Sequence, residues 1–127
     1  MALNVQFTNN ASTALASGIT NIATTLTVST GAGALFPTLT GSKYFYCTLI
    51  DAATAAVIEI IKVTARSGDT FTMTRAQEGT TGHAYLTGDK VELRITAAGL
   101  NAISTETSAP FITANVAQTS YIFNGGL

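Results

Sequence analysis

The sequence predicts an all-β domain, a small β-sandwich or barrel with one short helix near 97–103 and extended terminal arms. Short runs of alternating apolar and polar residues recur along the chain, which is the period of a half-buried strand. Glycine, proline and aspartate separate these runs, as expected for turns. The chain has 127 residues, of which 46% are hydrophobic, enough for one domain with a buried core.

Two strands are predicted in the first half of the chain, at 24–30 and 41–51. In the first, Leu26 and Val28 share one face and hydroxyl side chains occupy the other. In the second, both faces are largely apolar, so we expect it to be covered on two sides. The glycine-rich stretch 31–33 ends the first predicted strand and separates it from the second.

The middle of the chain predicts a β-hairpin. The runs 56–65 and 70–75 both alternate, and Phe71 and Met73 are expected to face inward. The sequence RSGD at 66–69 predicts the turn, because glycine tolerates positive φ and aspartate bonds to nearby backbone.

The last predicted strand, 90–96, alternates most cleanly. Val91, Leu93 and Ile95 are expected inward, between charged residues that point outward. A turn at 87–89 precedes this strand.

A short helix is predicted at 97–103, where Leu100 and Ile103 stand at helical spacing. Thr96 is a suitable N-cap for it.

Both ends are interpreted as arms that flank a β domain at 19–104. Most of the N-terminal arm (1–18), the stretch 8–18, is small and polar, whereas 105–127 contains one charge and several large apolar residues. Such an apolar tail is expected to lie on a neighbouring subunit or partner, or to add a strand to its own sheet. The anchors of the C-terminal arm are predicted to be Phe111, Tyr121, Ile122 and Phe123.

The charge content of the chain indicates which kinds of partner it can bind. Charged residues make up 10% of the chain and the formal net charge is −1, so no basic stripe for nucleic acid is present. No run approaches ~20 apolar residues, the length needed to span a membrane, and the N-terminus does not resemble a signal peptide. A surface with so few charges favours association, so we expect a homo-oligomer or a subunit of a larger assembly.

The sequence predicts no catalytic, cofactor-binding or metal-binding residues. His83 has no nearby cysteine or second histidine, and it is interpreted as a loop residue. Cys47 lies inside a strand pattern without a neighbouring cation and is expected to be buried. The acids Asp51, Asp69 and Asp89 are dispersed over turns, where aspartate bonds to local backbone. The chain is therefore not expected to be an enzyme.

One corner, RAQEGTTG at 75–82, concentrates polar residues in this charge-poor chain. Arg75 and Glu78 are close enough in sequence to pair across a tight turn at Gly79. The corner either sets the shape of its loop or contacts another subunit, since arginine is enriched at interfaces. Its candidate residues are Arg75, Gln77, Glu78, Thr80 and Thr81.

Several motifs follow one another in a characteristic order over about residues 14 to 103. They are FP at 36–37, VTAR at 63–66, GD at 68–69, RAQEGTT at 75–81, GD at 88–89 and LR at 93–94. In these motifs the chain resembles a β-rich module of tailed-bacteriophage virion proteins. That module occurs at the N-termini of tail fibre proteins and as small stand-alone structural proteins.

The resemblance implies a non-enzymatic structural protein of the virion, assembled in the bacterial host cytoplasm and contacting other phage virion proteins. An adaptor or fibre-mounting component of the tail or head-to-tail region is expected. In fibre proteins a receptor-binding shaft follows the module, whereas this chain stops soon after the predicted helix. The alternatives are a capsid decoration protein and a carbohydrate-binding host-attachment module that uses Tyr44, Tyr46 and Tyr85.

Overall fold

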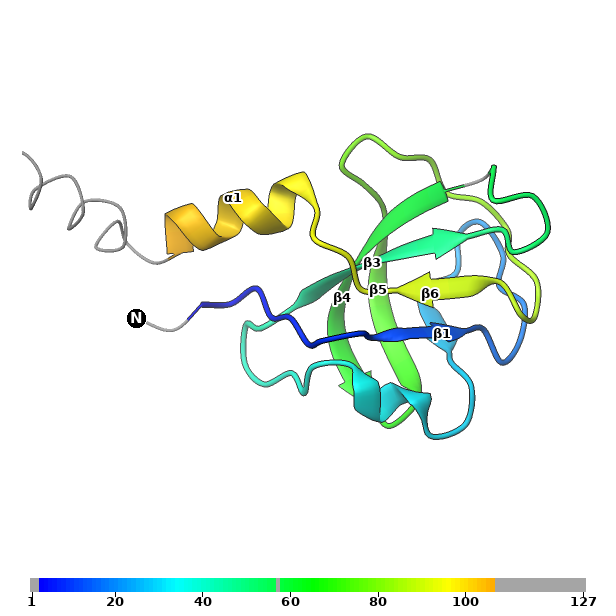
Figure 1. Ribbon diagram of the computed structural model, residues 1–127, viewed down its shortest axis with the longest axis horizontal. Helices are drawn as coiled ribbons and strands as arrows, with labels where there is room; N and C mark the ends of the chain where they lie inside the picture. The colour runs from blue at the N-terminus through cyan, green and yellow to red at the C-terminus, as the bar shows by residue number, and fades with distance from the viewer. Residues whose placement is uncertain (1–2, 57, 107–127) are drawn as a thin grey trace, which may run out of the picture.

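The alternating runs form a six-stranded antiparallel sheet that curls around the core (Figure 1). The computed structural model describes residues 3–56 and 58–106. The elements are β1 (Ser12–Ala14), β2 (Thr25–Thr27), the 3-10 helix η1 (Ala32–Leu35), β3 (Phe45–Ile50), β4 (Ile58–Ser67), β5 (Thr70–Gln77), β6 (Lys90–Glu92) and α1 (Ala97–Glu106). The predicted all-β class, a small sandwich or barrel with one short helix, is confirmed.

The strand order is β1-β6-β3-β4-β5-β2, so the two shortest N-terminal strands form the edges. The sheet curls far enough that these edges meet, because Leu15 and Val28 form an antiparallel bridge. On either side of this bridge, Ala16 N donates to Thr27 O at 2.9 Å and Ser29 N donates to Ala14 O at 3.0 Å. Edge backbone groups are thereby satisfied within the domain.

The inward faces of the strands make one core. Phe36, Phe45 and Phe71 pack together in it, with ring centroids 5.0–5.7 Å apart. Its other members are Ala11, Leu15, Leu26, Val28, Cys47, Leu49, Ile61, Val63, Met73, Tyr85 and Val91. The predicted inward residues of the hairpin and of the strand at 24–30 are thus buried as expected.

The hairpin of β4 and β5 is the longest pairing of the sheet, and it contains two irregularities. One lies between the pairs Ile60–Gln77 and Lys62–Thr74, the other between Val63–Met73 and Ala65–Thr72. Bulges of this kind bend a strand and increase its twist, which helps a sheet close on itself.

The strand predicted at 90–96 is shorter than its sequence pattern. β6 ends at Glu92, and Ile95, which was expected to face inward, is exposed. The N-terminal segment pairs with Tyr44 just before β3, where Gln6 N donates to Tyr44 O and Tyr44 N donates to Asn4 O. These bonds occupy the backbone N–H and C=O of Tyr44, so a longer β6 could not pair with β3 there. The chain leaves the sheet after residue 93 and enters α1.

The expected N-terminal arm is instead part of the β domain. Ser12–Ala14 pairs with β6, and Val5, Ala11 and Leu15 are buried. The small and polar composition of 8–18 gave little period-two signal, because only Ala11 and Leu15 of that stretch are buried in the core.

The predicted helix is present and runs beyond 103, from Ala97 to Glu106. Gly99 N donates to Thr96 Oγ1 at 3.1 Å, which confirms Thr96 as the N-cap. Figure 1 shows α1 projecting from one end of the sheet. None of the helices in the described parts of the chain is long and apolar enough to cross a membrane.

Candidate functional site

The polar corner is built around a carboxylate that lies in the core. Glu59 is 0% exposed, and it accepts four hydrogen bonds. Arg75 Nε and Nη2 donate to its two oxygens, each at 2.8 Å. The backbone N–H groups of Ala76 and His83 donate at 2.9 and 3.1 Å. A buried charge is tolerated only when it is paired and hydrogen-bonded in this way.

The guanidinium of Arg75 uses all five of its N–H donors within the chain. Besides the two bonds to Glu59, Nη1 donates to Thr20 O at 2.8 Å and Ala23 O at 3.1 Å, and Nη2 donates to His83 O at 2.6 Å. Arg75 therefore ties β5 to β4, to the loop at 20–23 and to the loop around His83. No donor of this side chain is left for another subunit.

A bulge in β5 helps to aim Arg75 at its partners. Between the pairs Ile60–Gln77 and Lys62–Thr74, two residues on β5 stand opposite one on β4. Ala76, the second of the two, has a φ of 54°, the left-handed region that a non-glycine residue seldom adopts. Its N–H then points at Glu59 Oε2.

The predicted pair of Arg75 with Glu78 is wrong, because Arg75 binds Glu59 instead. Glu78 Oε1 accepts from Ala98 N at 3.0 Å, at the start of α1. A carboxylate there is favourable, since the first N–H groups of a helix lack internal partners and carry partial positive charge. The corner thus also anchors the helix to the sheet.

The remaining corner residues hold the loop backbone. Thr80 Oγ1 donates to Gln77 O at 2.7 Å and accepts from Ile60 N at 3.0 Å. Gln77 Nε2 donates to Arg75 O at 3.0 Å. Thr81 is exposed. Four of the five predicted corner residues therefore bond to the chain's own backbone or to Glu59.

The electrostatics of the corner favour an ionised Glu59. Burial by itself raises the pKa of the carboxyl, but hydrogen bonds from Arg75, Ala76 and His83 and the charge of Arg75 outweigh it, so the pKa lies below the ordinary value of 4.5. Burial, and then the negative charge of Glu59, raises the pKa of the Tyr85 phenol well above its ordinary value. The Tyr85 hydroxyl is buried and makes no hydrogen bond of ordinary length within the described residues.

Sequence reasoning missed Glu59. It interrupts the apolar run of β4, and it has the same strand parity as the buried Ile61 and Val63. A charged residue on the inward face of a strand predicts a buried partner. The signal was therefore present, but the identity of the partner depends on which strand lies beside it.

A second polar lock joins the glycine-rich turn to the hairpin. Asp69 accepts from Gly31 N at 3.0 Å and from Gly33 N at 2.8 Å. These two bonds hold the pKa of the Asp69 carboxyl below its ordinary value of 3.8. A Cβ on Gly33 would lie 2.1 Å from Gly68 O, so the two backbones approach too closely for any side chain.

Asp51 and Asp89 also act on backbone. Asp51 Oδ1 accepts from Ala53 N at 2.9 Å within its own turn. Asp89 accepts from Leu86 N at 2.8 Å and from Ala52 N at 3.0 Å, which joins two loops. No group of acids, histidine and cysteine among the described residues is arranged to hold a metal ion.

The other candidate side chains do not lie together in one site. Cys47 is buried, and burial raises the pKa of its thiol well above the ordinary value. His83 is exposed, and it is its backbone that binds the Arg75–Glu59 pair. Tyr85 is buried, so it cannot form one exposed cluster with Tyr44 and Tyr46.

Tyr44 and Tyr46 lie edge to face, with ring centroids 5.6 Å apart, and the Lys62 ammonium lies 4.3 Å from the Tyr44 ring centroid. Tyr46 lies against α1, because a Cβ on Gly99 would be 3.6 Å from its Cδ2. The predicted arm anchors Phe111, Tyr121, Ile122 and Phe123 lie outside the described residues.

No pocket is found in the described part of the structure. No protein-family model matches the sequence, and no curated protein matches it.

Proposed function

We propose that the chain is a non-enzymatic structural subunit of a tailed-phage virion, in the tail or head-to-tail region, where it mounts or adapts other virion proteins. The proposal starts from the spaced motifs that resemble the phage module. In the structure, side chains of the most distinctive motif, Arg75 to Thr81, bond to the chain's own backbone, and this supports the proposal.

The geometry of the corner carries this proposal. Arg75 and Glu59 join two strands and two loops, and Glu78 attaches α1 to the same corner. A building block that must present one shape in every copy gains from such a lock, because the corner is held by many mutually dependent bonds. Catalysis would instead need polar groups directed at a substrate.

The test is the composition of the particle. We expect mass spectrometry of purified virions of a phage that encodes this chain to detect the protein in mature particles. Its absence from them would contradict the proposal, and a purified virion protein of the same phage provides the positive control.

The position on the particle is decided by copy number. Few copies per virion, quantified against the major capsid protein, agree with the tail or head-to-tail region. Enough copies to cover the capsid surface would instead identify a capsid decoration protein.

A further inference from the structure

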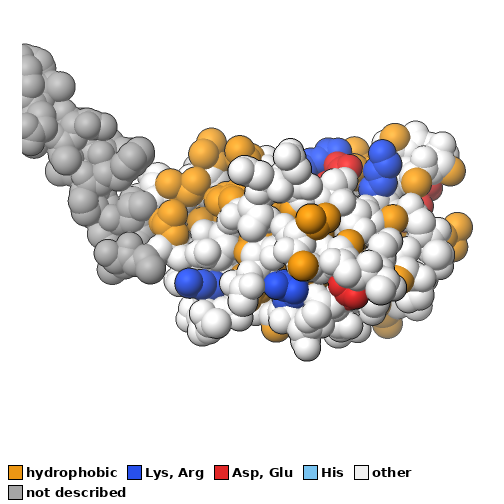
Figure 2. Space-filling model, turned by 60° about the horizontal axis from the view of Figure 1, so that its bottom comes forward, with side chains coloured by type: hydrophobic (Ala, Val, Ile, Leu, Met, Phe, Trp, Pro, Cys, Tyr) orange, Lys and Arg blue, Asp and Glu red, His pale blue; other side chains and the backbone are white. Residues whose placement is uncertain are grey.

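An exposed apolar surface lies where α1 meets the N-terminal segment. We call it the α1 surface and define it by Phe7, Ile95 and Leu100, which are 37%, 73% and 58% exposed. Figure 2 shows hydrophobic side chains gathered at the end of the molecule from which α1 projects.

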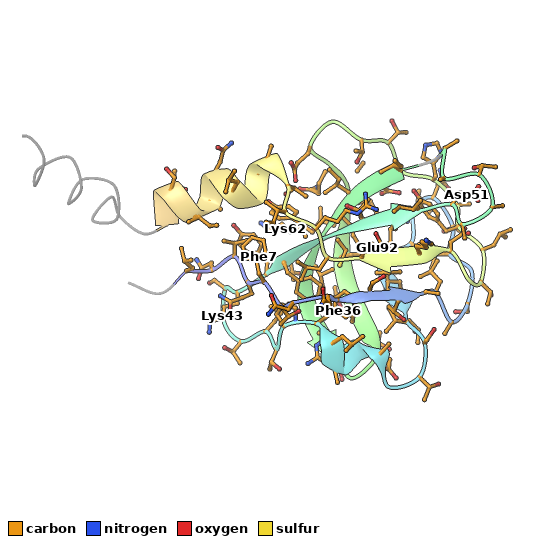
Figure 3. All side chains as sticks on the ribbon, viewed as in Figure 1. Phe7, Phe36, Lys43, Asp51, Lys62 and Glu92 are labelled. Atoms are coloured by element: carbon orange, nitrogen blue, oxygen red, sulfur yellow. The ribbon has the colours of Figure 1, made fainter. Side chains whose placement is uncertain are left out.

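The three residues belong to neighbouring parts of the structure. Phe7 lies against the first turn of α1, because a Cβ on Gly99 would be 3.5 Å from its Cζ. Figure 3 places Phe7 beside the helix. Ile95 precedes the N-cap Thr96 and Leu100 is the fourth helical residue, the two positions of a hydrophobic staple.

The α1 surface is also uncharged along its sequence. Residues 95–105 contain no Asp, Glu, Lys or Arg. Ile22 and Leu86, which are also exposed, stand outside α1, on two loops that the Ile19–Tyr85 bridge joins. Single exposed apolar residues are ordinary on a protein surface, whereas a group of them around one helix indicates a contact site.

We propose that the α1 surface binds the C-terminal segment, residues 107–127, of a second copy of this chain. That segment directly follows α1 and contains no charged residue. Its large apolar residues are Phe111, Ile112, Tyr121, Ile122 and Phe123. An uncharged segment with large apolar residues matches the exposed apolar side chains of the α1 surface in chemistry.

The direction of α1 favours a second copy over the chain's own surface. The helix carries the chain away from the sheet, so its own C-terminal segment would have to reverse direction to return (Figure 1). Fully extended, 21 residues span at most about 70 Å, which is long enough to reach a neighbour. Exchange between two copies is reciprocal, so both surfaces are covered at once.

This inference rests on the proposed role as an assembling subunit, and it names the contact through which copies join. It is tested on purified full-length protein, so its outcome is separate from detection of the chain in virions. A protein that is found in particles but fails the following test keeps its virion role and loses this contact.

The test uses cysteine pairs. One full-length chain carries Leu100→Cys and another carries Ile122→Cys, and the two are mixed under mild oxidation. Cys47 is buried and stays in place. We expect a disulfide-linked dimer that joins positions 100 and 122, identified by peptide mass spectrometry, in severalfold excess over the control. The matched control replaces Leu100→Cys by Ile22→Cys, an apolar position elsewhere that is more exposed than Leu100, at 78% against 58%, so lower accessibility cannot explain weaker linkage there.

Three results would overturn the proposal. The first is an intrachain disulfide in a monomeric chain that carries both Leu100→Cys and Ile122→Cys. It would show that the C-terminal segment binds the α1 surface of the same chain. Predominant linkage of Leu100→Cys to itself means that two α1 surfaces pair directly. Linkage no greater than in the Ile22→Cys control means that the segment does not bind this surface.

Discussion

At the scale of the residue, the main feature is one buried ion pair that holds several segments. Glu59 is buried and the Arg75 side chain is 10% exposed, so water screens this pair little. Each partner satisfies the other and also bonds to backbone. Removing one partner therefore leaves a buried charge without compensation.

The first prediction concerns Glu59→Gln. We expect it to lower the free energy of unfolding by roughly 3 kcal/mol, because Arg75 loses its buried counter-ion. Chemical denaturation followed by circular dichroism measures the change. The matched control is Glu92→Gln, which removes a pair with the exposed Arg94 and is expected to cost at most about 1 kcal/mol. Equal losses for the two variants would contradict the buried-pair argument.

The second prediction concerns pH. The folded-state pKa of Glu59 is lowered, so its contribution to stability is fully present above the unfolded-state value near 4.5. It is lost as the pH falls through the folded-state pKa. We expect the unfolding free energy of the native protein to decrease below pH 4.5, and that of Glu59→Gln to decrease less steeply. Asp69 and Glu92 also have lowered pKa values and add slope of the same sign in both proteins. Parallel curves for the two proteins would rule out the contribution of Glu59.

At the scale of the element, the turn at 31–33 and the β4–β5 hairpin interlock. Gly33 lies against Gly68 O, and the Asp69 carboxylate accepts from two N–H groups of that turn. Gly31 has a φ of 83°, so the two glycines are needed for different reasons. Gly31 is needed for its conformation, whereas Gly33 is needed for space.

The third prediction compares these two glycines. In Gly33→Ala the new Cβ meets backbone that cannot rotate away, so we expect a loss of about 1–3 kcal/mol, as for overpacking of a core. In Gly31→Ala nothing lies within 4 Å, and the cost is only that of a positive φ, about 1 kcal/mol. Thermal and chemical denaturation of both variants measure the order. A larger loss for Gly31→Ala would show that the turn moves to accept a side chain at 33.

At the scale of the whole molecule, the N-terminal segment closes the curled sheet. Leu15 forms a bridge with Val28 and is buried in the common core. The N-terminal segment also pairs β1 with β6, which is distant in sequence, and closing so long a loop costs entropy that burial in the core must offset. The segment before β2 is therefore part of the cooperative unit.

The fourth prediction tests this closure with Leu15→Ala. Removing a buried leucine side chain is expected to cost about 2–5 kcal/mol, because it leaves a cavity in the core. The control is Ile22→Ala, at a site 78% exposed, with an expected change within about 0.5 kcal/mol. A small effect of Leu15→Ala on the unfolding midpoint would mean that the N-terminal segment is a separable arm.

The strands from β2 onward were predictable because their signal is local. Alternation placed Leu26, Val28, Phe71 and Met73 in the core, and Thr96 marked the start of α1. Both signals act within a few residues of chain, where the geometry of a strand or a helix N-terminus is fixed. The sequence by itself therefore determined the fold class and the order of the longer elements.

Only the tertiary structure decided which polar groups meet. Sequence distance suggested Glu78 as the partner of Arg75, but antiparallel pairing and a bulge bring Glu59 beside it, sixteen positions earlier in the chain. In the same way, packing drew Val5 and Leu15 into the core and left Ile95 exposed. The physical reason is that a buried charge or an edge strand can bond only to groups that lie next to it in the folded sheet. Those neighbours do not depend on separation in sequence.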